Sequence, residues 1–252
     1  MNLVFPDMNI QYKSLSQRIR VVSELWMQNE MYCPACGRKH LFKLPNNAKV
    51  ADFFCDRCGE IYELKSKGRP VGGQILDGAY YTALERITSS TNPNLFVLRY
   101  SKNDVIDLTL ISKHFFTPDI LLQRKALSQN ARRAGYTGSI ILYDRIPLQG
   151  KISIVEAQNE FDKKIVMHNY KKAESLRVKD LTSRGWLMDV LNCINKLQKK
   201  EFSSCDAYGF ATELEEKHPD NHNVQAKIRQ QLQILRDKHF IEFLGNGVYR
   251  KL

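Results

Sequence analysis

The spacing of apolar residues along this 252-residue chain changes from helical to strand-like within its first 60 positions. In residues 12–29, Val22 and Trp26 recur at helical spacing, and Ser14 or Ser16 is available as a cap, which predicts a helix. Shorter apolar runs bounded by polar turns follow, and these are typical of strands. The further elements expected in this part are strands at 50–54, 60–65, 95–100, 105–111 and 152–155 and a helix at 77–87. This order favours an α/β or α+β core.

A separate pattern begins after residue 181. Three helical stretches are expected, at about 187–197, from Ser203 or Ser204 to about 217, and from Asn223 onward. Two short apolar runs then flank Gly245-Asn246-Gly247, which is a hairpin turn signal. Three helices followed by a β-hairpin is the order of a winged helix-turn-helix. We therefore expect a first domain at residues 1–181 and a winged-helix DNA-binding domain at residues 182–252.

The charge of the chain indicates a polyanionic partner. Its net charge is +11, and most of the excess lies in residues 1–180, which hold 27 basic and 18 acidic side chains. No apolar run approaches the roughly 20 residues that span a bilayer. The first residues lack the pattern of a signal peptide, so a cytoplasmic protein without a membrane partner is expected.

Four of the six cysteines form two CxxC pairs, Cys33 with Cys36 and Cys55 with Cys58. The 18 residues between the pairs are within the usual range for structural zinc sites. Zinc in such sites takes four ligands in a tetrahedron, often thiolates. Because four protein ligands leave no open position, we expect Zn²⁺ to have a structural role here.

The second CxxC pair lies inside an acidic pattern, Asp52-x10-Glu63-Leu64-Lys65. Two carboxylates on adjacent antiparallel strands can share one Mg²⁺, with the backbone carbonyl of Leu64 as a further ligand. Lys65 lies two residues after Glu63 and so shares its strand face. The pattern predicts catalytic Asp52, Glu63 and Lys65 in a nuclease. A solvated strand face is the alternative for this short motif, and Glu24 is either an extra ligand or an ordinary surface residue.

Two segments are candidates for DNA contact. Residues 123–138 predict a basic loop that includes Arg132 and Arg133. The third helix of the second domain resembles a recognition helix, in which arginine can pair with guanine and glutamine with adenine. Its candidate DNA-contacting side chains are Arg229, Gln230, Gln233 and Arg236. Winged helices also mediate protein contacts, which remains the alternative for this domain.

Taken together, these motifs resemble the methyl-directed (type IIM) restriction endonucleases of the PD-(D/E)xK superfamily. The resemblance covers nearly the whole chain. It includes residues 32–34, 50–53, 63–67, 77–80, 92–94, 131–135, 183–186 and, most specifically, 227–238. It implies a PD-(D/E)xK endonuclease core with a zinc knuckle, followed by a winged helix. Ala51 stands where a proline often precedes the first acid.

The resemblance also implies a function. The family cuts double-stranded DNA at GATC when the adenine is methylated, uses magnesium, belongs to bacterial restriction systems, and reads the site with both domains. Tyr136 stands where the family carries tryptophan, and if that side chain packs near the methylated base, tyrosine still offers a ring face. We expect a monomer in solution. The alternatives are a non-enzymatic zinc and winged-helix regulator, or a nuclease of another specificity.

Overall fold

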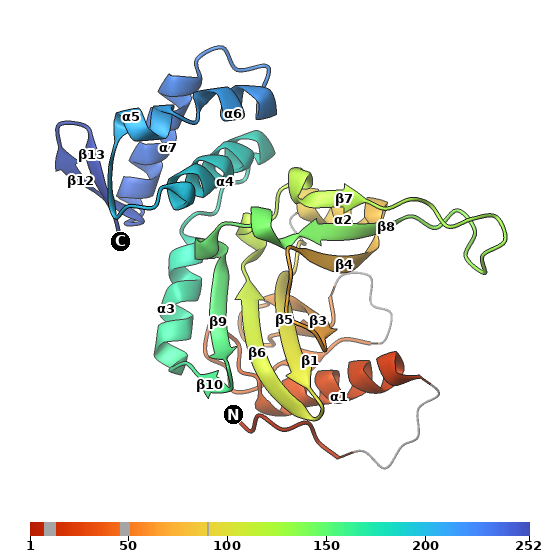
Figure 1. The fold of residues 1–252 in the computed structure, drawn as a ribbon. Helices are drawn as coiled ribbons and strands as arrows, with labels where there is room; N and C mark the ends of the chain where they lie inside the picture. The colour runs from red at the N-terminus through yellow and green to blue at the C-terminus, as the bar shows by residue number, and fades with distance from the viewer. Residues whose placement is uncertain (8–13, 46–50, 90) are drawn as a thin grey trace. The chain divides into compact units, whose positions relative to one another are not determined.

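The computed structural model describes residues 1–7, 14–45, 51–89 and 91–252. The chain folds as two compact units, coloured along the sequence in Figure 1. The first comprises Met1–Asp144 and Gln149–Glu174, and the second comprises Arg145–Leu148 and Ser175–Leu252. Among the described residues, no helix has both the length and the apolar character needed to cross a bilayer.

A seven-stranded sheet, counted over the described residues, forms the centre of the first unit. Its strand order is β1-β2-β3-β5-β6-β9-β10, and only β3 and β5 run parallel. The strands are β1 (Phe42–Lys43), β2 (Phe53–Phe54), β3 (Ile61–Lys67), β5 (Asn94–Ser101), β6 (Asp104–Ile111), β9 (Lys151–Glu156) and β10 (Asn159–Glu160). The expected strands are thus found, although β2 is shorter than residues 50–54, and Val50 lies outside the described residues.

Helices α1 (Leu15–Glu30) and α3 (Lys163–Glu174) cover one face of this sheet (Figure 1). Ser14 caps α1 by accepting from the N–H of Gln17, and Trp26 is buried, as the spacing predicts. Ser66 of β3 bonds Ser23 of α1 on this side. Because strand side chains alternate, Glu63 and Lys65 lie on the opposite face from Ser66. Helix α3 was not predicted, because most of its residues are polar or charged and its apolar residues are few.

A three-stranded sheet of the first unit faces Glu63 and Lys65, in the order β4-β8-β7. Its strands are β4 (Gln74–Ala79), β7 (Leu121–Gln123) and β8 (Gly138–Leu142), and α2 (Tyr80–Thr88) follows β4. The expectation of a helix from residue 77 is wrong, because residues 77–79 pair with β8. Ile75 is 1% exposed and Leu76 is 64% exposed, so burial alternates as in a strand.

The second unit has the helix order expected of a winged helix-turn-helix. Its helices are α4 (Leu181–Lys196), α5 (Ser204–Tyr208), α6 (Ala211–Lys217) and α7 (Val224–Asp237). The expected second helix is broken at Gly209 and Phe210 into α5 and α6. The hairpin of β12 (Ile241–Gly245) and β13 (Val248–Lys251) follows α7, and β11 (Glu201–Ser203) adds a third strand that pairs with β13. Val224, Ile228, Leu232 and Leu235 of α7 are buried, as predicted.

Candidate active site and zinc centre

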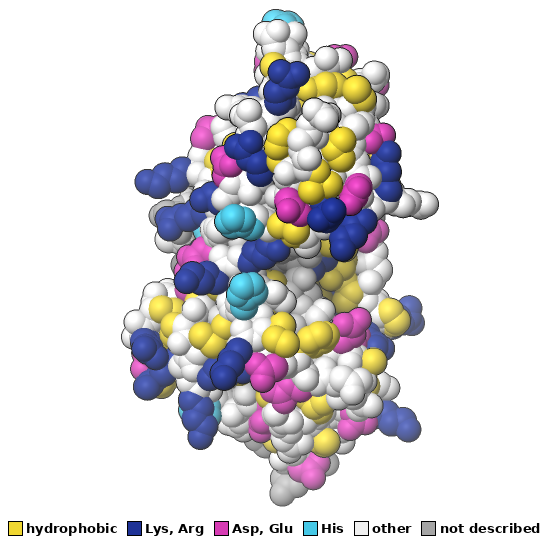
Figure 2. Space-filling view, turned by 90° about the vertical axis from the view of Figure 1, so that its left-hand side faces the viewer, with side chains coloured by type: hydrophobic (Ala, Val, Ile, Leu, Met, Phe, Trp, Pro, Cys, Tyr) yellow, Lys and Arg dark blue, Asp and Glu magenta, His cyan; other side chains and the backbone are white. Residues whose placement is uncertain are grey.

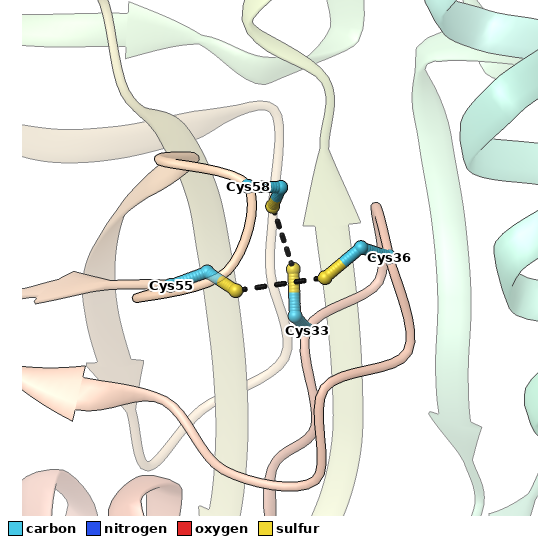
Figure 3. Close-up of side chains that lie close together, drawn as sticks. All are labelled: Cys33, Cys36, Cys55 and Cys58. Carbon is cyan, nitrogen blue, oxygen red and sulfur yellow. Dashed lines mark hydrogen bonds between the residues drawn. The ribbon is translucent and has the colours of Figure 1, made fainter.

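Four cysteine sulfurs converge on one point in the first unit (Figure 3). All four lie within 4.8 Å of one another. Cys33 Sγ lies 3.6 Å from Cys58 Sγ, and Cys36 Sγ lies 3.6 Å from Cys55 Sγ. A tetrahedral zinc ion with bonds of about 2.3 Å requires sulfur separations of about 3.8 Å. The cluster therefore fits a structural Zn²⁺ held by thiolates.

The two CxxC turns have the same backbone geometry. Gly37 follows the first pair and Gly59 the second, with φ angles of 76° and 73°. Each glycine donates its N–H to the carbonyl of the first cysteine of its pair, at 2.8 Å and 2.9 Å. Since left-handed φ values favour glycine, the sequence CxxCG closes both turns without strain. A glycine directly after each CxxC pair is therefore a sequence signal for these turns.

The second CxxC turn joins β2 to β3, and this connection sets the geometry of the acidic pair. Phe53 pairs with Tyr62, and extending the register by one residue sets Asp52 opposite Glu63. Because β2 pairs only with the first two residues of β3, the rest of that edge is open. The Asp52 carboxylate accepts the N–H of Leu64 there, at 2.8 Å.

The carbonyl of Leu64 also points toward the open edge. In an extended strand, the N–H and C=O of one residue point to the same side, and the N–H of Leu64 points to Asp52. Leu64 lines a cleft of about 540 Å³ together with Asp52, Glu63 and Lys65. The chain thus gathers two carboxylates, one backbone carbonyl and one ammonium at a single cleft.

Two cations bind Glu63. Lys65 Nζ lies 2.7 Å from Glu63 Oε1, and Arg86 of α2 lies 3.3 Å from Glu63 Oε2. Lys65 Nζ also lies 2.7 Å from Asp77 Oδ1, whose side chain is 4% exposed. Sequence reasoning missed Asp77 and Arg86, because their approach depends on how β4 and α2 pack against β3.

Electrostatics distinguish the groups in the cleft. Burial raises the pKa of Asp52 above its ordinary value, the N–H of Leu64 opposes this shift, and the carboxylates of Glu63 and Glu24 add to it. Burial lowers the pKa of Lys65, but the negative charges on Glu63 and Asp77 outweigh it, so the pKa of Lys65 is raised. Lys65 is therefore an ammonium. The ionised form of Asp52 is disfavoured by burial and by nearby negative charges, and a bound cation would offset this cost.

The interpretation of Glu24 as an ordinary surface residue is wrong. Glu24 is only 4% exposed and lines the same cleft as Asp52. Its two oxygens are occupied by Arg20 Nε and Lys43 Nζ, each at 2.7 Å. In this arrangement the charge of Glu24 is balanced by two cations, of which Arg20 also lines the cleft.

The loop between β7 and β8 projects away from both strands (Figure 1). Arg132 and Arg133 are exposed in it, and the Arg133 guanidinium lies 3.9 Å from the ring centroid of Tyr136. This cation–π contact holds the ring and the charge together at an exposed position. The basic loop expected at residues 123–138 is confirmed, and its side chains are accessible.

In the second unit, the exposed side of α7 carries Arg229, Gln230, Gln233 and Arg236. Arg229 Nε donates to the hydroxyl of Tyr208, and Arg236 pairs with Asp237. The buried side of α7 packs in the core of the unit. The third helix of a winged helix-turn-helix is the element that enters the DNA groove in proteins of this architecture, and here its polar side is exposed.

Basic side chains are not gathered into one patch on the face drawn in Figure 2, where Lys and Arg are spread among Asp and Glu. On that face, positive and negative side chains are interspersed. Dispersed charge gives long-range attraction to a polyanion but does not mark a contact surface. The β7–β8 loop and α7 therefore remain the candidates for DNA contact.

Two family models together match nearly the whole chain. The model of the Dam-replacing family, DpnI, matches residues 1–179. The model of the Dam-replacing HTH domain matches residues 182–251. These matches indicate a nuclease of the restriction type that acts on DNA and carries a DNA-binding helix-turn-helix. The chain belongs to the Dam-replacing, or DpnI, family.

Proposed function

We propose that this chain is a magnesium-dependent endonuclease that hydrolyses double-stranded DNA at GATC sites with methylated adenine. One observation carries the proposal. Asp52, Glu63 and Lys65 meet at the open edge of β3, in a cleft, on the part of the chain that matches the Dam-replacing family. Their chemistry is that of a PD-(D/E)xK site, in which two acids and a lysine act on a phosphodiester.

The donor set in the cleft suits magnesium. Mg²⁺ prefers oxygen ligands and is usually held by one or two carboxylates, with substrate phosphate and water completing its shell. The oxygens available are the carboxylates of Asp52 and Glu63 and the carbonyl of Leu64. When bound, the ion would acidify the attacking water and stabilise charge on the phosphoryl oxygens.

The chain's own residues have separate roles in this proposal. Asp52 and Glu63 would hold the ion through their carboxylates. Lys65, kept as an ammonium by its neighbours, orients the attacking water and stabilises the negative charge that develops on the phosphate. The four cysteines would hold Zn²⁺ and so fix the β2–β3 connection, and four thiolate ligands would leave that ion no open position for chemistry.

Both units would read the methylated site. Burying one methyl group is worth roughly 0.8 kcal/mol, which is too little for stringent selection. Reading two methyl groups, or reading the site once by each unit, multiplies the preference. Arg132, Arg133 and Tyr136 would contact DNA from the first unit, and Arg229, Gln230, Gln233 and Arg236 from the second. A monomer would then cut the two strands in turn.

The cleft disfavours a purely regulatory role. A DNA-binding regulator has no need for Asp52, whose pKa is raised by burial and by the adjacent Glu63 and Glu24. Strained ionisable groups in a cleft are typical of sites that perform chemistry or bind metal. A cleavage assay on DNA molecules that differ only in adenine methylation would distinguish the proposed enzyme from a nuclease of another specificity.

Lys65→Ala tests the assignment of the cleft. The variant should lose at least about 100-fold in cleavage rate with Mg²⁺, and its affinity for methylated DNA in Ca²⁺ should stay within about twofold. Lys151→Ala is the matched control, because Lys151 is a half-buried lysine of β9 that lies over Tyr143, outside the cleft. Full activity of Lys65→Ala would reject the catalytic assignment.

A further inference from the structure

Asp77 reaches Lys65 from a different sheet. Lys65 and Glu63 belong to β3 of the large sheet, and Asp77 belongs to β4 of the small one. The ammonium of Lys65 lies between them, 2.7 Å from an oxygen of each carboxylate. A buried carboxylate is costly unless it is paired, and Asp77 is nearly inaccessible to solvent. The ion pair with Lys65 provides that compensation.

Asp77 occupies an inward-facing position of β4. Alternation along β4 puts Asp77 on the same side as Ile75, which is 1% exposed. An apolar residue would be the ordinary occupant of such an inward position. The pairing of β4 with β8 shifts register between Asp77 and Ala79, and such irregularities often occur beside active sites. The chain therefore places a charge where packing alone would favour an apolar side chain.

Building on the proposed nuclease function, we propose that Asp77 is a positioning residue that keeps Lys65 in place when Glu63 binds the metal ion. A dication at Glu63 brings a second positive centre close to the ammonium of Lys65, and like charges repel. Glu63 then shares its charge with the ion and attracts Lys65 less. Asp77, whose Oδ1 also lies 2.7 Å from the ammonium, opposes its displacement toward solvent.

Asp77 does not belong to a preformed metal cluster. Within the described ranges, the four cysteines form the one group of three or more metal-ligating side chains placed to hold an ion, and Asp77 is not in it. The Asp77 oxygen nearest Lys65 is engaged with its ammonium, and the second oxygen accepts weakly from the hydroxyl of Ser139 at 3.5 Å. Asp77 thus acts through Lys65.

The test compares Asp77→Asn with the wild-type chain, using full-length protein and a duplex with methylated GATC. The single-turnover cleavage rate with Mg²⁺ should fall roughly 10- to 100-fold, the range expected when a reacting group is misplaced by about an ångström. The affinity for the same duplex in Ca²⁺ should change by less than about twofold. Asp107→Asn is the control, since it removes a carboxylate paired with Arg99 on the same sheet, and its rate should match the wild type.

A double-mutant cycle separates positioning from general damage. If Asp77 acts through Lys65, Asp77→Asn should cause no further loss in a Lys65→Ala background. Additive losses, or a wild-type rate for Asp77→Asn alone, would overturn the proposal. Failure of the wild-type chain to cut methylated DNA would instead reject the nuclease function, and the role of Asp77 with it.

A measurement on the wild-type chain covers the case in which Asp77→Asn does not fold. The Nζ resonance of Lys65, assigned through Lys65→Arg in protein with ¹⁵N-labelled lysine, should be visible in the metal-free chain, because an ammonium held by two carboxylates exchanges slowly with water. The same resonance should persist when DNA and Ca²⁺ are added. Its disappearance on adding Ca²⁺ would show that Lys65 is released, contrary to the proposal.

Discussion

The hydroxyl of Tyr62 lies 3.1 Å from the sulfur of Cys33. Tyr62 is buried and stacked on Phe96, with ring centroids 5.1 Å apart. The next residue along β3 is Glu63, which lines the cleft on the other face of the sheet. Adjacent residues of one strand therefore contact the cysteine cluster and the candidate active site, which ties the position of one to the other.

Tyr62→Phe should weaken zinc binding. Burial raises the pKa of the Cys33 thiol to about 11, and the hydrogen bond from Tyr62 opposes this shift by stabilising the thiolate. Loss of a hydrogen bond to a metal ligand typically costs about 10- to 100-fold in metal affinity. Competition with a chromophoric chelator measures the effect. Tyr249→Phe, which removes the hydroxyl of a buried tyrosine in the second unit, should leave zinc affinity unchanged.

Cys55→Ser should abolish cleavage although no cysteine touches the substrate. Cys55 begins the turn between β2 and β3, and loss of zinc frees that turn, so Asp52 and Glu63 lose their register. Metal content, measured by atomic absorption, and cleavage rate should fall together. A folded, fully active variant without zinc would contradict this link.

Asp52→Asn should stabilise the protein without bound Mg²⁺ at neutral pH. The pKa of Asp52 is raised in the fold by burial first and by the neighbouring acids, so its ionised form disfavours folding at pH values above that pKa. The penalty disappears as the pH falls below the unfolded value of about 3.9. Asparagine keeps an oxygen for the N–H of Leu64, and we expect a gain of about 0.5–2 kcal/mol in the free energy of unfolding.

Urea unfolding of the zinc-loaded protein without Mg²⁺, at pH 7.5 and at low pH, measures this effect. The difference between Asp52→Asn and wild type should shrink as the pH falls, while cleavage by the variant is lost at every pH. A less stable variant at pH 7.5 would mean that Asp52 has a net stabilising role in the fold without bound Mg²⁺.

The double variant Arg132→Ala, Arg133→Ala should reduce the salt dependence of DNA binding. Each arginine that contacts phosphate contributes about one unit to the slope of log affinity against log salt concentration. Fluorescence anisotropy in a sodium chloride series should therefore give a slope smaller by about two. Lys164→Ala, Lys171→Ala removes the same charge from exposed positions of α3 and should leave the slope near the wild-type value.

Local patterns predicted what depends on local chemistry. The CxxC spacing identified the four cysteines, and the capping signal at Ser14 identified the start of α1. The acidic motif was placed on adjacent antiparallel strands, and Asp52 and Glu63 are indeed opposite each other across β2 and β3. These features are set by residues close together in the sequence.

Long-range pairing explains what the patterns missed. Residues 77–79 have apolar neighbours at helical spacing, yet pairing with the distant strand β8, through Ser139 and Gly138, makes them a strand. That pairing brings Asp77 to Lys65 and places Arg86 beside Glu63. The break between α5 and α6 at Gly209 was also missed, because the apolar spacing continues through it.

The most direct test of the central claim is a cleavage assay with Mg²⁺ on one plasmid prepared with and without adenine methylation at GATC. A sample with chelator serves as the control. Cutting of the methylated plasmid alone, abolished by chelator, is the predicted result. Equal cutting of both plasmids would reject the methyl-directed specificity. Absence of cutting by folded, zinc-loaded protein would contradict the assignment of Asp52, Glu63 and Lys65 as a nuclease site.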